Sequence, residues 1–251
     1  MKREKSRVII IIPARYSSSR FPGKPLAEID KLPMIQHVYE RAKKTKYHDE
    51  VIVATDDMRI FEAVRKFDGK VVMTKVDHQS GTDRVAEVAQ DREADIIVNV
   101  QGDEPLINPS AIDQAIEPLV EDEHLAMSSL MTRIRNEEEC SDSNIVKVVV
   151  DQQNNALYFS RSCIPYPRHK EGLQIYKHVG IYVYRKDFLL RLSAMEQTPL
   201  ERTESLEQLR VLENGFRIRM VNTNYESISV DTPEDLEYIH SILTAKNRRD
   251  N

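Results

Sequence analysis

Short, continuous hydrophobic runs alternate with longer amphipathic segments along the first half of the chain. Runs rich in Val and Ile are typical of strands buried on both faces of a sheet. Four such runs cover residues 7–13, 51–54, 70–74 and 96–100. Helical spacing of apolar residues predicts helices over residues 34–46, 58–67, 82–90 and 109–120. This alternation predicts an α/β fold with a mostly parallel central sheet and helices on both faces.

The pattern changes after residue 125, where shorter connections join strands expected at residues 125–132, 145–150, 157–159 and 176–184. These strands predict a smaller mixed-sheet region. A single amphipathic helix is expected over residues 201–213, with Leu206, Leu209 and Leu212 facing inward. A strand at 216–221 and a helix starting at Thr232 and Pro233 complete the pattern.

The loop after the first strand, residues 13–24, reads P-A-R-Y-S-S-S-R-F-P-G-K. Its small residues let backbone amides turn toward a ligand, and Arg15, Arg20 and Lys24 can neutralise several negative charges. We interpret it as a phosphate-binding loop that lacks the Walker spacing of Gly and Lys. The alternative is a solvated basic loop.

Two carboxylates follow strand-like runs, Asp103 in the segment Q-G-D-E-P and Asp231 before the last helix. In parallel sheets, ligands bind beyond the carboxyl ends of the strands. Magnesium prefers one or two carboxylates together with phosphate oxygens and water, so this pair is a candidate metal site. Turn formation and helix capping are the alternative roles, and the sequence leaves open whether the two residues meet.

Two further polar groups are candidates for ligand binding. The segment D-H-Q-S-G-T-D-R at residues 77–84 runs into a predicted helix N-terminus, which attracts phosphate; the alternative is a capped junction with no ligand. In the second region, Arg161 and His178 could hold a carboxylate. A lone histidine is more often structural.

Composition narrows the function classes. The net charge of −5 over 251 residues gives no basic footprint for nucleic acid. The longest apolar run, residues 8–12, is too short for a membrane span, and the N-terminus has no signal-peptide core. We therefore expect a cytoplasmic protein. Its two cysteines, Cys140 and Cys163, are expected to be free thiols.

Seven motifs in order resemble those of the 3-deoxy-manno-octulosonate cytidylyltransferases, or CMP-Kdo synthetases. The resemblance covers residues 7–242. The motifs are P-A-R-Y-S-S-S-R-F-P-G-K-P-L, D-H-Q-S-G-T-D-R, V-N-V-Q-G-D-E-P, A-L-Y-F-S-R-S-C-I-P-Y, K-H-V-G-I-Y, L-E-Q-L-R-V-L-E and V-D-T-P-E-D-L-E.

The resemblance implies a nucleotide-diphospho-sugar transferase fold, a homodimer, and conversion of CTP and the acid sugar Kdo to CMP-Kdo and pyrophosphate. In the family this reaction serves lipopolysaccharide synthesis. Residues 1–251 would form one nucleotidyltransferase domain. Its nucleotide-binding part would span about 7–124, its sugar-binding and dimerisation part about 125–198, and its return to the main sheet about 199–245.

The resemblance also implies roles for individual residues. Catalysis would depend on Arg15, Lys24, Asp103 and Asp231, of which Asp103 and Asp231 would bind Mg2+. The nucleotide would contact Ala14, Arg15, Arg20, Lys24, Ser80, Gly81 and Arg84. The sugar would contact Gln101, Arg161, His178, Tyr182, Glu207 and Gln208.

Departures from the family pattern leave the sugar open. Phe21 replaces a usual Leu, Asp83 a usual Glu, and Ser229 a usual Gly. The stretch at 226–229 resembles a branch that activates 8-amino-Kdo, whereas residues 101–104 resemble the ordinary enzyme. A sialic acid substrate and a non-catalytic nucleotide-binding relative are further alternatives. A dinucleotide-dependent oxidoreductase is disfavoured because no G-x-G-x-x-G follows the first strand.

Overall fold

The computed structural model describes residues 6–18, 20–169 and 171–247, and the chain folds into two compact units. Unit 1 contains Asp95–Val98 and Ala111–Glu226. Unit 2 contains Arg7–Ala94 and Asn99–Ser110, together with the segment that begins at Ser227. The proposed three-part division of the sequence stays a prediction.

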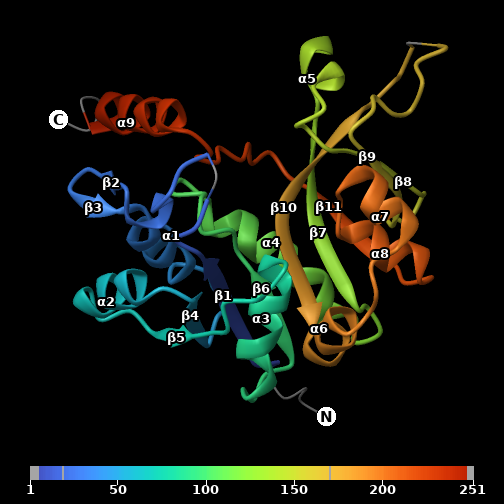
Figure 1. The fold of residues 1–251 in the computed structure, drawn as a ribbon. Coiled ribbons are helices and arrows are strands. Elements are labelled where there is room, and N and C mark those ends of the chain that lie inside the picture. The colour runs from blue at the N-terminus through green and yellow to red at the C-terminus, as the bar shows by residue number, and fades with distance from the viewer. Residues whose placement is uncertain (1–5, 19, 170, 248–251) are drawn as a thin grey trace. The chain divides into compact units, whose positions relative to one another are not determined.

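Unit 2 is built on the parallel strands β1 (Val8–Ala14), β4 (Glu50–Thr55) and β5 (Val71–Met73), which pair in that order (Figure 1). Most residues of β1 and β4 are buried, which agrees with their uninterrupted hydrophobic sequences. The helices α1 (Met34–Ala42), α2 (Met58–Lys66) and α3 (Gly81–Gln90) pack against these strands. Parallel pairing places the carboxyl ends of the strands at one edge.

The remaining elements of unit 2 are short or terminal. The 3-10 turn η1 (Lys24–Leu26) leads into the hairpin of β2 (Glu28–Ile29) and β3 (Leu32–Pro33), and the helix α9 (Pro233–Asn247) ends the described chain. Residues of β6 (Ile96–Asn99) and α4 (Pro109–Glu121) are divided between the two units. Directly after β6, the N–H of Val100 donates to the carbonyl of Ile11, 3.2 Å away, so this segment runs beside β1.

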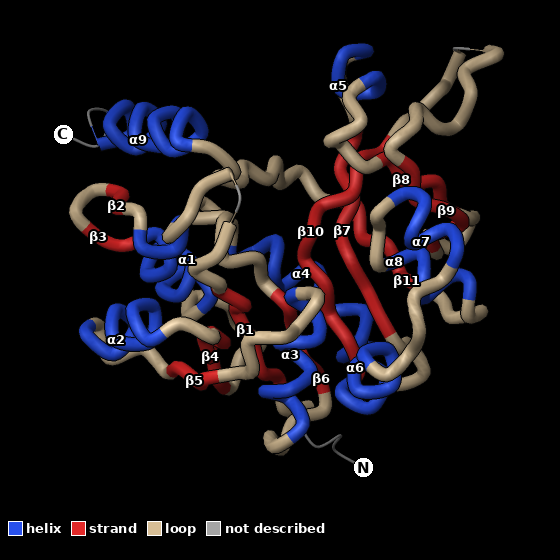
Figure 2. Tube along the Cα trace, in the orientation of Figure 1, coloured by secondary structure: helices blue, strands red, loops and turns tan. Residues whose placement is uncertain are grey.

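Unit 1 centres on two long antiparallel strands, β7 (Met127–Arg133) and β10 (Tyr176–Arg185), which lie side by side in Figure 2. The strand β11 (Ile218–Asn222) pairs with β7 in parallel. The strands β8 (Lys147–Val150) and β9 (Ala156–Ser160) extend the antiparallel pairing from β10. This unit also contains α5 (Glu137–Ser141), α6 (Lys186–Ser193), α7 (Pro199–Glu204) and α8 (Gln208–Glu213).

The predicted fold class is confirmed. One unit has parallel strands with helices, and in the other unit antiparallel strands dominate. Most predicted strands and helices occur within a few residues of their expected bounds. Within the described residues, no helix has both the length and the apolar character needed to cross a membrane.

The single helix expected over residues 201–213 is wrong. Ser205 adopts a left-handed conformation with φ 53° and ψ 48°, and it ends α7 before α8 begins at Gln208. The carbonyl of Glu204 accepts a hydrogen bond from Arg161 Nε at 2.7 Å instead of continuing a helix. The spacing of the leucines does not reveal this break, because Leu206 and Leu209 are buried although the helix is interrupted.

The expectation of two free thiols is also wrong, because Cys140 and Cys163 form a disulfide. Their Cα atoms are 5.1 Å apart, within the usual range for a disulfide. The bond joins α5 to the segment after β9, across a sequence separation of 23 residues. Sequence alone could not show this proximity, which depends on how unit 1 folds.

Candidate active site

The phosphate-loop candidate is closed at its base by one backbone hydrogen bond. The N–H of Gly23 donates to the carbonyl of Tyr16, 2.9 Å away. Gly23 has φ +74°, a left-handed conformation that favours glycine, and it turns the chain so that η1 can begin at Lys24. Inside the loop, Ser18 Oγ accepts from the N–H of Phe21 at 3.3 Å. Ser19, one of the three predicted loop hydroxyls, lies outside the described residues.

Lys24 is the point at which the loop meets both candidate metal ligands. Its Nζ lies 2.7 Å from Asp103 Oδ2 and 3.3 Å from Asp231 Oδ1. Arg20 adds a second contact, with 3.3 Å between its Nη2 and Asp231 Oδ1. The structure therefore brings together two carboxylates that are 128 positions apart in sequence, a meeting that the sequence left open.

The position of Asp103 depends on backbone contacts around it. Its carbonyl accepts from the N–H of Val230 at 2.9 Å, and Val230 is fully buried in a core cluster that includes Ile29 and Met34. A Cβ on Gly102 would lie 2.8 Å from the carbonyl oxygen of Pro13. Only glycine fits there without a shift of the backbone. The absence of a side chain at Gly102 therefore allows the segment that carries Asp103 to lie close to the end of β1.

Asp231 is held by the start of α9. The carboxylate of Asp235 accepts from the N–H groups of Asp231 and Thr232, each at 2.8 Å. Burial alone would raise the pKa of Asp235, but these N–H groups, the Thr232 hydroxyl and the charge of Lys24 lower it instead. Asp235 consequently stays ionised and fixes the backbone of Asp231.

The carboxylate pair fits a magnesium ion by its donor chemistry. Hard oxygen ligands are what Mg2+ selects, and one or two carboxylates suffice where phosphate oxygens and water complete the octahedron. The described part of the chain contains no group of three or more His, Cys, Asp or Glu side chains that could hold a metal ion. The site therefore suits a metal that arrives with, or is completed by, a phosphate ligand.

The segment at residues 77–84 is a capped helix N-terminus. Ser80 Oγ accepts from the N–H of Asp83, and the Asp83 carboxylate accepts from the N–H of Ser80, both at 3.1 Å. This capping box confirms the structural interpretation. It is compatible with the ligand-binding one, because Ser80 and Gly81 both line the cavity described below.

Arg84 is buried, with 4% of its surface exposed. Its Nη2 donates to Asp56 at 2.8 Å, and its Nη1 donates to the Thr74 hydroxyl and to the carbonyl of Lys75. Asp56, which follows β4, was not identified from the sequence. A carboxylate after a strand and before a helix is too common a pattern to single it out.

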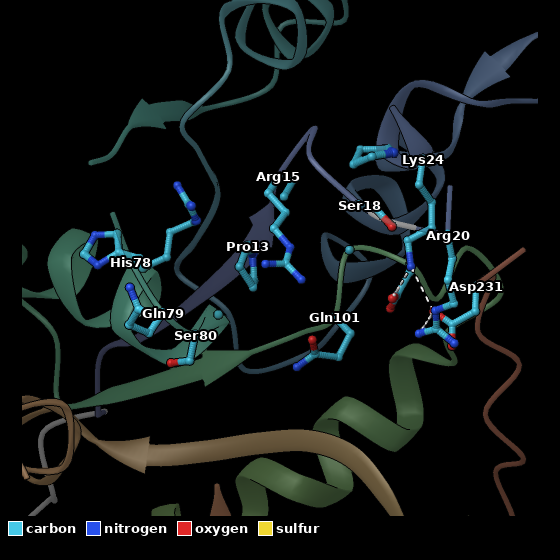
Figure 3. A pocket seen from close by; sticks show the side chains of 16 residues that line it. Pro13, Arg15, Ser18, Arg20, Lys24, His78, Gln79, Ser80, Gln101 and Asp231 are labelled. Atoms are coloured by element: carbon cyan, nitrogen blue, oxygen red, sulfur yellow. Dashed lines mark hydrogen bonds and ion pairs between the residues drawn. The ribbon is translucent and has the colours of Figure 1, made fainter. Parts of the chain in front are cut away.

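These residues enclose a cavity of about 330 Å³ that lies wholly within unit 2. In Figure 3, Lys24, Arg20 and Asp231 lie at one end, His78, Gln79 and Ser80 at the other, and Arg15 projects between them. The lining consists of Pro13, Ala14, Arg15, Ser18, Arg20, Lys24, Pro25, His78, Gln79, Ser80, Gly81, Arg84, Gln101, Gly102, Asp103 and Asp231. All seven predicted nucleotide contacts and both predicted metal ligands are among them.

The predicted sugar contacts are divided between the units. Gln101 lines the cavity of unit 2, whereas Arg161, His178, Tyr182, Glu207 and Gln208 belong to unit 1. Gln208 is the first residue of α8 and is buried, with 4% of its surface exposed, and Glu207 directly precedes that helix.

His178 lies half-buried on β10, against Ser129 and two aromatic rings. Its Nε2 is 2.8 Å from Ser129 Oγ, and its ring centroid is 5.2 Å from that of Phe159 and 5.3 Å from that of Tyr182. Desolvation lowers the pKa of His178 to about 4. The ring is therefore neutral near pH 7 and carries no positive charge that could balance a carboxylate.

Arg161 is fixed mainly by backbone carbonyls. Its Nε donates to the carbonyl of Glu204 at 2.7 Å and its Nη1 to that of Ser143 at 2.8 Å. The Glu204 side chain accepts from the N–H of Arg161 at 2.9 Å and from Ser160 Oγ at 2.7 Å. Burial would raise the pKa of Glu204, but these donors and the Tyr158 hydroxyl lower it. Nothing in the sequence distinguished Glu204 from neighbouring glutamates.

An α/β unit that gathers a basic loop, two carboxylates and a helix N-terminus at the carboxyl edge of parallel strands has the architecture of a phosphate-handling, nucleotide-binding enzyme. The paired carboxylates point further, to the class that transfers phosphoryl or nucleotidyl groups with a divalent metal.

Comparison with known proteins defines the class more narrowly. The model of the cytidylyltransferase family matches residues 9–223. The 3-deoxy-manno-octulosonate cytidylyltransferase of Geobacter metallireducens is 57% identical over 244 residues, which cover 93% of this chain and 96% of that protein. The protein of the same name from Solibacter usitatus is 54% identical over 240 residues, covering 95% of each chain.

A solved structure agrees with these relatives. It is that of CMP:2-keto-3-deoxy-manno-octonic acid synthetase in complex with CTP, and it matches 96% of this chain and 100% of its own length. The TM-score is 0.93 at 47% sequence identity. The chain therefore belongs to the cytidylyltransferase family, among the 3-deoxy-manno-octulosonate cytidylyltransferases. The family predicted from the seven motifs is confirmed.

Proposed function

We propose that this protein transfers CMP from CTP to the anomeric hydroxyl of Kdo, giving CMP-Kdo and pyrophosphate. The observation that supports this most directly is the contact of Lys24 Nζ with both Asp103 and Asp231. It joins the triphosphate loop to a carboxylate pair suited to Mg2+ within one cavity. The names of the close relatives supply the identity of the nucleotide and the sugar.

The layout of the cavity suggests how CTP binds. Arg15, Arg20 and Lys24 would neutralise the triphosphate at one end, while Ser80, Gly81 and Arg84 would surround the cytosine and ribose at the other. Asp56 would keep Arg84 fixed, because the buried guanidinium is already paired with that carboxylate. Ala14, at the end of β1, would contact the nucleotide through its backbone.

Nucleotidyl transfer depends mainly on positioning and on neutralising charge. The sugar hydroxyl would attack the α-phosphate, the bond to pyrophosphate would break, and Arg15 and Lys24 would stabilise the negative charge that leaves. Asp103 and Asp231 would hold Mg2+, which when bound supplies positive charge on phosphate oxygens and lowers the pKa of a coordinated hydroxyl. We assign no side chain as general base.

The sugar would be bound by Gln101, Arg161, His178, Tyr182, Glu207 and Gln208. Arg161 would be the charged partner of the sugar carboxylate, because His178 is neutral near pH 7. The names of the relatives favour Kdo over its 8-amino form, although the 226–229 stretch resembles the branch that activates the 8-amino sugar. We further propose a homodimer that works in the cytoplasm and supplies lipopolysaccharide synthesis.

One assay tests this function. The protein is incubated with CTP, Mg2+ and, separately, Kdo, 8-amino-Kdo or a sialic acid, and pyrophosphate and CMP-sugar are measured. We expect the highest kcat/KM with Kdo and no pyrophosphate without a sugar. Absence of pyrophosphate release with all three sugars would reject the cytidylyltransferase assignment, and a preference for 8-amino-Kdo would reassign the substrate.

A further inference from the structure

A cation–π contact joins helix α2 to the phosphate-loop candidate. The guanidinium carbon of Arg59 lies 3.3 Å from the centroid of the Tyr16 ring. Tyr16 belongs to the loop and follows Arg15 directly, whereas Arg59 is the second residue of α2. Neither residue lines the cavity, so any effect of this contact on a ligand must pass through the loop.

The orientation of Arg59 is set by Asp57, the N-cap of α2. Asp57 Oδ1 accepts from the backbone N–H and the Nε of Arg59, each at 2.9 Å, and Oδ2 accepts from Nη2 at 2.7 Å. A bidentate ion pair of this kind fixes the plane of the guanidinium group. One flat face of that plane is left for the Tyr16 ring, a geometry that arginine adopts and lysine does not reproduce.

Tyr16 is also held in place by Gly23, through one backbone hydrogen bond and close packing of its side chain. The carbonyl of Tyr16 accepts from the N–H of Gly23 at 2.9 Å. A Cβ on Gly23 would lie 3.0 Å from two ring carbons and from the hydroxyl oxygen of Tyr16, so this side chain packs closely on the glycine. Tyr16 and Gly23 are each adjacent in sequence to a predicted triphosphate contact, Arg15 and Lys24 respectively.

We propose that Arg59, oriented by Asp57, is a positioning residue that holds the nucleotide loop in its binding conformation before CTP arrives. The stacked guanidinium fixes the Tyr16 ring, and the ring and its carbonyl fix Gly23, so Arg15 and Lys24 start from defined backbone positions. A loop ordered in advance loses less conformational entropy on binding. The contact therefore acts on CTP capture and leaves the transfer step unchanged.

This inference rests on the proposed function, and it is tested by Arg59→Ala. Removing a cation–π contact of ordinary strength should raise the KM and the Kd for CTP about fivefold. The kcat and the KM for Kdo should stay within twofold of wild type, a separation that general destabilisation would not produce. Arg59→Lys, which keeps the charge but loses the flat face, should give an intermediate KM for CTP.

Arg65→Ala is the matched control, because it removes the same charge from an exposed position of the same helix. It should leave the KM for CTP unchanged. Tyr16→Phe, which keeps the ring, should raise that KM less than Tyr16→Leu. If the two residues act through each other, the Tyr16→Leu/Arg59→Ala double variant should be no worse than Tyr16→Leu alone.

Two results would overturn the inference while the proposed function stands: an Arg59→Ala enzyme with the wild-type KM for CTP, or an equal rise in Arg65→Ala. A double variant whose KM for CTP rises by the product of the two single effects would also overturn the inference. A wild-type protein that neither binds CTP nor turns it over with Kdo would reject the proposed function and this inference together.

Discussion

Lys24 contacts Asp103 and Asp231 at the same time, and these contacts join the basic loop to both candidate metal ligands. Their types and their positions after strands identified each as a candidate. Their meeting depends on the Val230 to Asp103 hydrogen bond and on the absence of a side chain at Gly102. The sequence therefore identified the residue types that gather here, whereas their meeting required the folded chain.

His178 shows the opposite case, in which the environment changes what a residue type suggests. The sequence offered a histidine that could be charged beside a carboxylate. Enclosure by Phe159, Ser129 and Tyr182 instead favours the neutral ring. Enclosure of this kind comes from strand pairing in unit 1, which no local motif reports.

The lowered pKa of His178 predicts acid sensitivity. The unfolded chain binds a proton at this residue near pH 6.5 and the folded chain only near pH 4, so the unfolded state gains stability as pH falls. The stability that the neutral His178 ring contributes to the folded state is fully present above about pH 6.5 and is lost progressively toward pH 4. Between pH 7 and 5, wild type should lose about 2 kcal/mol more unfolding free energy than His178→Gln. Urea denaturation at both pH values measures this, and equal losses would contradict it.

At the scale of elements, hydrophobic periodicity located most helices and strands, because each buries one continuous face. Periodicity failed where a side chain that is distant in sequence determines the backbone conformation. The break between α7 and α8 is such a place, since Arg161 takes the Glu204 carbonyl and Ser205 turns into the left-handed region. The short helices α5 and α6 were also missed, because five to eight residues give too little periodicity to recognise.

The left-handed Ser205 predicts a stabilising substitution. A non-glycine residue in this conformation costs about 1 kcal/mol relative to glycine, part of which is offset by the greater freedom of glycine in the unfolded chain. Ser205→Gly should therefore raise the unfolding free energy by about 0.5 kcal/mol. Ser205→Ala is the control and should be less stable than Ser205→Gly in urea denaturation. The same stability for both variants would show that this position is not strained.

At the scale of the whole molecule, composition and the seven motifs predicted the class, the family and the α/β architecture. They did not predict the disulfide, because the two cysteines were judged by number and by the expected compartment. The Cys140–Cys163 bond depends on two segments of unit 1 that are distant in sequence. Disulfides are uncommon in cytosolic proteins, so the redox state of this bond bears directly on the proposed localisation.

Reduction of the bond should destabilise the protein. Closing a loop of 23 residues stabilises a folded chain by about 3 kcal/mol in the chain-entropy model. A phosphine reductant should therefore lower the unfolding free energy by about that amount. The Cys140→Ser/Cys163→Ser variant should be insensitive to the reductant. Equal stability of wild type with and without reductant would contradict the prediction.

In the proposed reaction, Asp103 acts with Asp231 and a bound Mg2+ at the end of the cavity where Lys24 lies. The most direct test is the rate of pyrophosphate release from CTP and Kdo by Asp103→Asn, with Asp91→Asn as a control that removes an exposed carboxylate outside the cavity lining. We expect the rate to fall at least about a hundredfold in Asp103→Asn and to stay normal in Asp91→Asn. Near-normal pyrophosphate release by Asp103→Asn would contradict the account.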